Sequence, residues 1–580
     1  MTALLRYFKP YRWLAALVLL LVFLQSLSEL YLPTLMADIV NQGVLFGDTA
    51  YILRTGVWML LTAAFGVVCN IAASYFSAKA SSGFGRDLRS RLFAHVSGFS
   101  MREFDRFGAA SLMTRVTNDV TQVQQTIIMM LRMMAAAPMM AVGGMLMALA
   151  MDAQLALVII AVIPVLALTI FLISRKAMPL FKSMQTRLDR LNLVQREGLT
   201  GVRVIRAFNR TAHEQRRFDD ANRELTDTAL KATRIMAFTM PAMMLIVNFS
   251  SVAIVWFGGI RIDRGDLQVG DLMAFIQYAM MILFSLLMMS MLFVMLPRAA
   301  VSAGRIREVL ELPASVRDAD SAAQPGQPER PEAGGTVEFR DVTFRYPGAE
   351  QPALSNISFT AKPGEVTAII GGTGSGKTTL FNLILRFYDA ESGSVLVDGE
   401  DVRNWPQEKL RARIGYVPQQ AMLFTGTIAE NIRWGRDDAT DEDMRRAAET
   451  AQAFEFIREM EGGFDAQVAQ GGKNLSGGQK QRLAIARALV RKPGIYLFDD
   501  SFSALDYKTD AALRRALKAE TEGAAVLIVA QRISTVIDAD QIIVLDDGRI
   551  AGIGTHEQLL RENEVYREIA ATQLAEEEIA

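Results

Sequence analysis

The stretch GGTGSGKT, from Gly371 to Thr378, decides how the C-terminal half of this chain is built. It fits the pattern G-x-x-x-x-G-K-[ST] and lies between the apolar run EVTAII and the helical run TLFNLILRF. In a loop between a strand and a helix, glycines let backbone N–H groups approach phosphate oxygens, a lysine neutralises their charge and a hydroxyl coordinates Mg²⁺. The stretch therefore predicts a nucleotide-phosphate loop, with binding residues Gly372, Thr373, Gly374, Ser375, Gly376, Lys377, Thr378 and Thr379.

The sequence around this loop divides into three parts. From TVEFRDVTFRY onward short apolar runs alternate with helical ones, so we predict an α/β domain over residues 336–580. Residues 313–335, PASVRDADSAAQPGQPERPEAGG, are rich in Pro, Gly and Ala and are typical of a linker. Residues 1–312 contain the long apolar runs, and we predict a membrane domain there.

The composition is that of a membrane protein with a soluble part. Of 580 residues, 51% are hydrophobic and 21% are charged, and the mean hydropathy is +0.21. A net charge of −1 gives no indication of nucleic-acid binding. The single cysteine, Cys69, forms no internal disulfide and fits a reducing compartment.

Six apolar runs are long enough to cross a bilayer, which takes about 20 helical residues. They lie near residues 13–35, 55–78, 133–151, 154–174, 236–260 and 270–296. The first follows a basic start and has no A-x-A-like cleavage site, so we interpret it as a retained helix. Six such runs in one half of the chain favour transmembrane helices over the buried helices of a soluble core.

The distribution of basic residues predicts the orientation of the spans. The first connection contains only Arg54, and the fifth has Arg261 and Arg264 beside three aspartates. Residues 79–132 and 175–235, by contrast, are long and rich in Lys and Arg. The positive-inside rule then places both long connections and both termini in the cytoplasm, for a multi-pass protein of the inner (plasma) membrane.

The two long connections have helical spacing and few helix breakers. We therefore predict that the spans continue as helices well past the membrane. Short helices are expected at the turns, around residues 104–116 and 202–214, where they are candidate contacts to the α/β domain.

Two further stretches follow the phosphate loop. NLSGGQKQR, from Asn474 to Arg482, precedes a helical run, and LFDDSFSALD, residues 497–506, begins as an apolar strand that ends in two acids. The phosphate loop and these two stretches follow one another in the order found in ABC transporters. Essentially the whole chain resembles this family, specifically its half-transporters of the exporter type. The resemblance implies a six-helix α-helical membrane domain fused to an α/β P-loop nucleotide-binding domain, ATP and Mg²⁺ as ligands, and a second half-transporter as partner.

The resemblance also assigns roles to single residues. Tyr346 matches the aromatic residue that stacks on adenine, although a strand-end aromatic is the alternative. Gln419 matches the glutamine that senses Mg²⁺ and the membrane domain. Asp499 matches the acid that holds Mg²⁺, usually through water, and Thr378 completes the metal ligands. The signature that closes over ATP held by the opposite subunit is Ser476, Gly477, Gly478 and Gln479.

Three positions depart from the family pattern. Asp500 stands in place of the catalytic glutamate, Gln531 in place of the switch histidine, and Gln470 in place of a glutamate before the signature. The catalytic glutamate polarises the attacking water, and aspartate is one methylene, roughly 1.5 Å, shorter. A displacement of about 1 Å can cost about 100-fold in rate, and glutamine cannot carry a positive charge. We therefore expect this site to bind ATP but to hydrolyse it poorly.

An intact signature beside weakened catalytic groups indicates that this chain completes a competent ATP site on a different subunit. The chain then resembles the degenerate half of a heterodimeric multidrug-type exporter. An active homodimer that tolerates the changes, a mainly regulatory ATP-binding subunit and an exporter-fold importer are the alternatives. The intact Gln419 and the two candidate contact segments favour a direct role in transport.

The membrane half also carries candidate substrate contacts. Ten of the 30 methionines fall between residues 113 and 151, and flexible, polarizable methionine suits surfaces that bind many shapes. Lipid-facing or packing methionine is the alternative. If methionines line a cavity, Met133, Met140 and Met288 are the candidates, and we expect amphipathic substrates of the drug or lipid class.

Two ionisable residues lie in or near the apolar runs. Glu29 is in the first span and Arg132 is at the start of the third, so both are candidates for a pathway or for pairing. A simple position of Arg132 at the cytoplasmic interface is the alternative.

Overall fold

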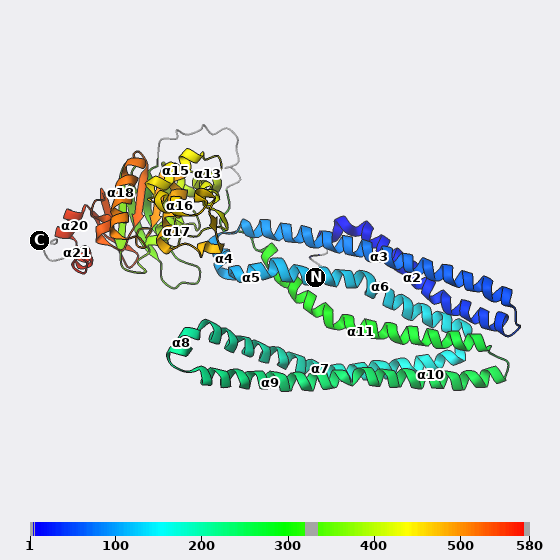
Figure 1. The fold of residues 1–580 in the computed structure, drawn as a ribbon. Coiled ribbons are helices and arrows are strands. Elements are labelled where there is room, and N and C mark those ends of the chain that lie inside the picture. The colour runs from blue at the N-terminus through cyan, green and yellow to red at the C-terminus, as the bar shows by residue number, and fades with distance from the viewer. Residues whose placement is uncertain (1–3, 5, 319–334, 574–580) are drawn as a thin grey trace. The chain divides into compact units, whose positions relative to one another are not determined.

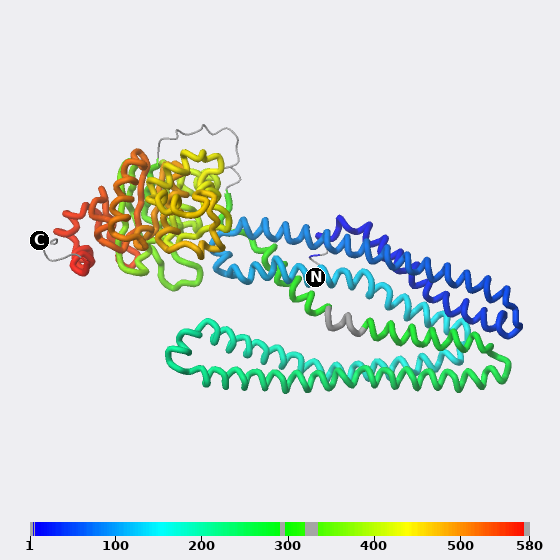
Figure 2. The backbone as a smooth tube through the Cα atoms, viewed as in Figure 1, coloured from blue at the N-terminus to red at the C-terminus, as the bar shows by residue number. Residues whose placement is uncertain are grey.

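The computed structural model describes Leu4 and residues 6–318 and 335–573, and of residues 290–295 it describes only the backbone. Most of the predicted linker over residues 313–335 thus lies outside the described residues. The chain divides into two compact units (Figures 1 and 2). Unit 1 comprises Met1–Ser97 and Ala110–Leu312, and unit 2 comprises Gly98–Ala109 and Pro313–Ala580.

Unit 1 is built from long helices. They are α2 Arg12–Asp38, α3 Thr49–Ser97, α6 Val120–Met151, α7 Ala153–Thr200, α9 Thr211–Ala237, α10 Thr239–Asp263 and α11 Val269–Glu311. In Figure 1, α2, α3, α6 and α11 run alongside one another, while α7, α9 and α10 form a second set. Six stretches of the described residues are long and apolar enough to cross a membrane, which confirms the six predicted spans.

The side chains of unit 1 are distributed as a bilayer requires. Small residues such as Ala80 and Ala148 are fully buried between helices. Large apolar residues are exposed instead, including Trp58 at 59% and Trp256 at 69%. Such surface is unfavourable in water but contacts lipid chains in a membrane, where close packing of small residues holds helices together.

The helices extend well past a bilayer, as predicted. α3 has 49 residues and α7 has 48, so each is roughly 70 Å long at about 1.5 Å per residue. Short helices also occur at the two predicted turns: α4 Met101–Phe107 with α5 Ala109–Thr114, and α8 Val202–Ala207. Of these, α4 belongs to unit 2, and α5 after Ala109 and all of α8 belong to unit 1.

Polar contacts join neighbouring helices at the end of unit 1 that lies opposite α5 and α8. Asp152 caps α7 by accepting a hydrogen bond from the Leu155 N–H at 2.8 Å, and Arg261 of α10 donates to its other oxygen at 2.5 Å. Asn41, just after α2, accepts from the Gly270 N–H of α11 at 2.7 Å. These contacts join α7 to α10 and the end of α2 to α11.

Unit 2 is an α/β fold with two main sheets. The six-stranded sheet has the order β12-β11-β3-β10-β9-β6, with β3, β6, β9, β10 and β11 parallel. Its strands are β3 Val366–Gly371, β6 Ile414–Val417, β9 Ile495–Asp499, β10 Ala525–Val529, β11 Gln541–Asp546 and β12 Arg549–Gly554. The four-stranded antiparallel sheet has the order β2-β1-β4-β5, from β1 Val337–Phe344, β2 Leu354–Ala361, β4 Ser392–Val397 and β5 Glu400–Asp401.

Helices connect and cover these strands. They are α12 Lys377–Ile384, α13 Gln407–Ala412, α14 Ile428–Arg433, α15 Asp441–Thr450, α16 Phe454–Glu459, α17 Gly477–Val490, α18 Tyr507–Glu520, α19 Ile533–Val536, α20 His556–Glu562 and α21 Glu564–Ala571. Strand β9 is apolar on both faces: Ile495 and Leu497 pack in one core, and Tyr496 and Phe498 in the other. A parallel strand buried on both sides needs this continuous apolar run, which is why GIYLFDD is apolar until its acids.

Candidate functional site

The carboxyl ends of three parallel strands meet beside the phosphate loop. Ile369 of β3 pairs with Val529 of β10, and Val529 also pairs with Asp499 at the end of β9. Ligands of parallel α/β sheets bind beyond the carboxyl ends of the strands. This register therefore brings the loop, the acidic strand end and the segment after β10 to one place.

The phosphate loop depends on its glycines. Gly374 and Gly376 have φ of 86° and 97°, in the left-handed region that favours glycine. A Cβ at Gly376 would also lie 2.8 Å from the carbonyl oxygen of Ala353. Helix α12 begins directly afterwards at Lys377, so its first N–H groups face the loop and favour an anion there.

The Lys377 side chain lies along the inside of this loop. Its Nζ donates to the carbonyl oxygens of Gly371 at 2.8 Å and Gly372 at 2.6 Å. Burial lowers the pKa of Lys377, and the nearby Asp500 and Asp499 carboxylates act in the opposite direction. The loop thus holds a cation at the place where phosphate charge has to be neutralised.

Asp499 and Thr378 form the candidate metal site. The Thr378 hydroxyl donates to the Asp499 carboxylate at 3.0 Å, and Asp499 is 1% exposed. Burial raises the pKa of Asp499 to about 6, against the lowering effect of that hydrogen bond. A hydroxyl, a carboxylate and the amide oxygen of Gln419 are the hard donors that suit Mg²⁺, and a divalent cation would favour the ionised carboxylate.

These residues alone do not enclose a metal ion. The part of the chain that the structure describes has no group of three His, Cys, Asp or Glu side chains able to hold one. Mg²⁺ is commonly held by one or two protein ligands together with substrate phosphates and water. The residues therefore fit Mg²⁺ that arrives with a nucleotide.

The two catalytic departures are in direct contact. Gln531 Nε2 donates to Asp500 Oδ2 at 2.9 Å, and Gln419 Nε2 approaches the same oxygen at 3.4 Å. Asp500 has φ of 46°, and its N–H donates to the Val529 carbonyl at 2.9 Å, which fixes where its side chain begins. Burial raises the pKa of Asp500, partly offset by the Gln419 contact. The carboxylate is therefore held by amides and not by a positively charged imidazole.

A cavity of about 210 Å³ joins these groups. Its lining residues are Ala353, Thr373, Gly374, Gly376, Lys377, Thr378, Thr379, Gln419, Asp499, Asp500, Val529 and Gln531. All of them except Ala353 and Val529 were predicted from the sequence. Those two are ordinary apolar residues, and only the packing around the loop brings them to the cavity.

Other predicted residues lie near this cavity without lining it. Gly372 and Ser375 belong to the loop, and their roles stay predictions. Tyr346 is half-buried, its ring lies edge-on to Tyr388, and its hydroxyl is 3.1 Å from that of Thr379. Its predicted stacking on adenine also stays a prediction.

The signature residues lie elsewhere in unit 2. Ser476 caps α17: its Oγ accepts from the Gln479 N–H at 3.3 Å, and Gln479 Oε1 accepts from the Ser476 N–H at 2.9 Å. Gly477 begins the helix, and Gly478 follows it. None of the four lines the 210 Å³ cavity. Within one chain, the loop and the signature thus belong to two separate places.

Comparison with known proteins agrees with this arrangement. Residues 15–287 match the ABC transporter transmembrane region, and residues 354–503 match the ABC transporter family. An uncharacterized ABC transporter ATP-binding protein of Mycobacterium tuberculosis is 47% identical over 98% of both chains. The chain belongs to the ABC transporter family.

Two more relatives refine the class of this ABC transporter. The ATP-dependent lipid A-core flippase of Pseudomonas fluorescens is 35% identical over 88% of this chain and 84% of its own. The structure of a bacterial Atm1-family ABC exporter with ATP bound matches with a TM-score of 0.79 and 27% identity, over 99% of this chain and 100% of that one. The chain is therefore an exporter-fold half-transporter, in which a transmembrane domain is fused to an ATPase domain that drives transport. Proteins of this fold work as dimers in a membrane.

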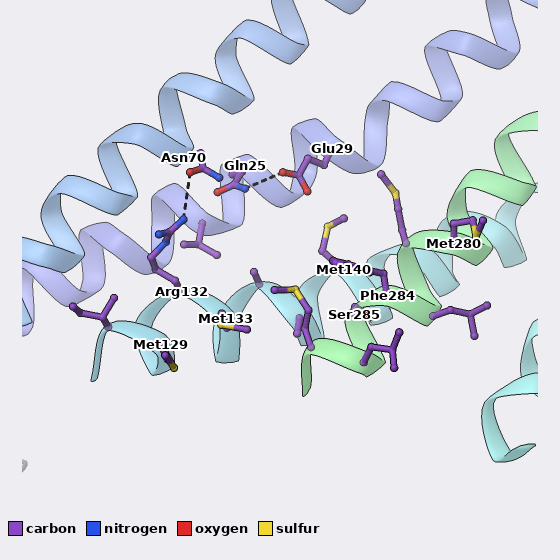
Figure 3. Close-up of a pocket in the computed structure, with 18 of the residues that line it drawn as sticks. Gln25, Glu29, Asn70, Met129, Arg132, Met133, Met140, Met280, Phe284 and Ser285 are labelled. Carbon is purple, nitrogen blue, oxygen red and sulfur yellow. Dashed lines mark hydrogen bonds between the residues drawn. The ribbon is translucent and has the colours of Figure 1, made fainter. Parts of the chain in front are cut away.

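The transmembrane domain of the ABC transporter contains a large cavity. It has a volume of about 830 Å³ and lies among α2, α3, α6, α10 and α11 (Figure 3). Met133, Met140 and Met288 all line it, as predicted. These three methionines thus border the cavity, and Met140 also packs against a core that includes residues of α2, α6 and α11, so their part in binding substrate stays a prediction.

Both ionisable membrane residues line the same cavity. Each is held by a neutral amide: Gln25 Nε2 donates to Glu29 at 2.8 Å, and Arg132 donates to Asn70 at 3.4 Å (Figure 3). Gln25 and Asn70 were missed in the sequence, where an isolated amide in an apolar run was their only signal. Glu29 and Arg132 thus line a cavity and contact amides, and their part in a transport pathway stays a prediction.

Proposed function

We propose that this ABC exporter is one half of a heterodimer, and that its own ATP site binds ATP but hydrolyses it slowly. The observation that carries the proposal is the contact between Gln531 and Asp500. A general base has to reach the attacking water and accept its proton. Here the acid is short, and one of its oxygens is already engaged by two amides.

The groups that bind the nucleotide are complete, in contrast. Lys377 and the N-terminus of α12 supply positive charge, and Thr378 and Asp499 supply oxygen donors for Mg²⁺. Binding without efficient hydrolysis makes sense in an assembly where another site does the work. The Ser476 hydroxyl and the following helix N-terminus would complete that site, on a partner that carries the catalytic glutamate and the switch histidine.

The transported compound is, in this proposal, an amphipathic molecule of the drug or lipid class. A methionine-lined cavity of about 830 Å³ supports it, as does the likeness to a lipid A-core flippase. The Lys- and Arg-rich connections support an inner-membrane protein with both termini in the cytoplasm. In this proposal the membrane domain covers residues 1–312, the linker covers residues 313–335 and the nucleotide-binding domain covers residues 336–580.

The test compares the full-length chain alone with the chain purified together with a candidate partner. The partner is a second half-transporter with Glu and His at the two positions that differ here. We expect steady-state ATPase activity of the chain alone to be about 100-fold lower than that of the pair. Replacing the partner's catalytic Glu with Gln is the control and should remove the activity of the pair. Strong ATPase activity from the purified chain alone, abolished by Asp500→Asn, contradicts the proposal.

A further inference from the structure

The charge pattern of the membrane cavity is unusual for an apolar pocket. Among its described lining residues, Glu29 of α2 and Arg132 of α6 are the charged ones, and methionines from α6 and α11 supply much of the remaining wall. Figure 3 shows Glu29 on α2 and Arg132 on α6, with the Arg132 side chain directed toward Asn70 of α3. Charges in a membrane-spanning domain are costly, so a pair of opposite charges facing one cavity needs a reason.

The two charges do not neutralise each other. No ion pair joins Glu29 to Arg132 among the side chains that the structure describes, and each instead contacts a neutral amide. Glu29 accepts from Gln25 at one oxygen, and a carboxylate has about four acceptor positions. Arg132 uses one of its five N–H groups for a long bond to Asn70. Both groups thus keep hydrogen-bonding capacity for a ligand.

Glu29 is also accessible from a second direction. Together with Asn70 it lines a separate cleft of about 250 Å³ that continues between α2 and α3 along Thr62 and Gly66. At Gly66 the two helices approach so closely that a Cβ would lie 3.2 Å from Ser28. The carboxylate therefore lies where the cleft between the helices meets the large cavity, and a polar headgroup could reach it from either space.

We propose that this cavity selects zwitterionic amphiphiles, whose cationic group binds Glu29, whose anionic group binds Arg132 and whose apolar body lies on the methionines. The inference rests on the proposed function, because it takes this cavity as the substrate site. An anionic amphiphile satisfies Arg132 but leaves Glu29 unpaired and close to a like charge. A cationic amphiphile does the reverse, so only a ligand with both charges compensates both side chains.

The test measures binding rather than transport. The full-length chain, assembled with its partner half-transporter, is held in amphipol so that no phospholipid competes with the probes. No nucleotide is added. Three probes with the same alkyl chain are compared by displacement of a fluorescent analogue: an alkylphosphocholine, an alkyltrimethylammonium and an alkyl phosphate. We expect the phosphocholine to bind at least about 10-fold more tightly than either of the other two probes, since each of those leaves one of the two opposite charges, Glu29 or Arg132, without a counter-ion.

Single variants then separate the two charges. Glu29→Gln should remove the advantage of the phosphocholine over the alkyl phosphate, and Arg132→Gln should remove its advantage over the alkyltrimethylammonium. Met133→Leu is the matched control in the same cavity. It keeps the volume and adds no charge, so it should change the affinities for all three probes by a similar factor.

Two outcomes overturn the inference. One is equal affinity of the unaltered protein for the three probes, a comparison that needs no variant. The other is an equal loss for all probes in both charge variants. An assembly that prefers the phosphocholine but shows no ATP-driven transport would support this inference and contradict the proposed function, so the two failures are distinguishable.

Discussion

At the scale of single residues, Asp500 and Gln531 set the chemistry of the ATP site. The sequence shows that both differ from the family pattern, and the structure adds that they touch. An imidazolium at position 531 would bring a positive charge beside the carboxylate and the phosphates, whereas an amide brings only a hydrogen bond. If Asp500 activates the attacking water, as we propose, the two changes act on one group and not on two independent ones.

Restoring both residues should restore hydrolysis at this site. With Asp500→Glu the carboxylate gains roughly 1.5 Å of reach, and Gln531→His removes one of the two amides at this oxygen and returns a titratable ring. We expect the double variant to raise turnover at this site by about 10-fold or more, and Asp500→Glu alone to raise it less. The measurement is vanadate-trapped nucleotide at this site, in a pair whose partner lacks its catalytic glutamate.

Gln470→Glu is the control for this experiment. It restores the third family residue at a position that does not line the phosphate cavity, so it should leave trapping unchanged. Unaltered trapping in the double variant would place the defect outside Asp500 and Gln531, for example in the partner's signature.

At the scale of elements, α4 is the segment that the membrane half contributes to unit 2. Glu103 is 4% exposed and accepts hydrogen bonds from Ser100 at one oxygen and from Ser315 at the other. Asp105 accepts from the Tyr388 hydroxyl at 2.5 Å. The contact predicted for residues 104–116 is thus found for α4, through Asp105. It begins before residue 104, because Ser100 and Glu103 take part as well. Contact by the other segment, around α8, stays a prediction.

Breaking the Glu103 contact should impair coupling. Glu103→Ala removes a buried carboxylate that accepts hydrogen bonds from both Ser100 and Ser315, and a hydrogen bond to a charged group is worth about 1.5–3 kcal/mol. We expect a lower Tm and loss of the stimulation of ATPase activity by substrate, with the unstimulated ATPase activity largely kept. Arg102→Ala, at an exposed neighbour, is the control and should change neither quantity.

The same contact has a defined pH dependence. Burial raises the pKa of Glu103, but hydrogen bonds from Ser100 and Ser315 outweigh it, so the pKa lies below its usual value. A depressed pKa means that the stabilisation is complete above the unfolded-state pKa of about 4.3 and is lost as the pH falls through the folded-state pKa. Equal Tm values for the Glu103→Ala protein and the unaltered protein at pH 7 would show that the contact contributes nothing.

At the scale of the whole molecule, the two halves of an ATP site are separated within this chain. The phosphate loop lines one cavity, and the signature at the start of α17 lies outside it. In the proposed heterodimer, Lys377 would serve this chain's own weak site, and Ser476 would serve the active site on the partner. The same chain can therefore carry one change that stops turnover and another that hardly affects it.

Substitutions in this chain of the assembled pair test that asymmetry. Removing a donor aimed at transition-state charge costs about 100- to 1,000-fold, so Ser476→Ala should nearly abolish steady-state ATPase activity. Gly477→Asp should do the same by adding a negative charge, and it should not disturb the fold, because a Cβ there meets no atom within 4 Å. Lys377→Ala should weaken nucleotide retention at this site and lower total turnover much less. Equal losses from the lysine and signature changes would contradict the degenerate-site proposal.

The sequence by itself determined the features that depend on short stretches of chain. Six apolar runs of helical length, the glycine pattern at 371–378 and the LSGGQ stretch at 475–479 each lie within a few turns or one loop. Local spacing specifies such elements, because burial in a bilayer, tight φ angles and helix capping act on neighbouring residues. The identities of Asp500 and Gln531 were visible in the same way.

Only the tertiary structure decided which distant residues meet. Gln531 and Asp500 come together because β9 and β10 pair in parallel register. Glu29 and Arg132 share one cavity because α2, α3 and α6 pack side by side, and α4 is attached to unit 2 through Ser315, more than 200 residues away. Contacts of this kind depend on helix packing and strand register, which are set by the summed burial of many side chains and are not encoded at either contacting position.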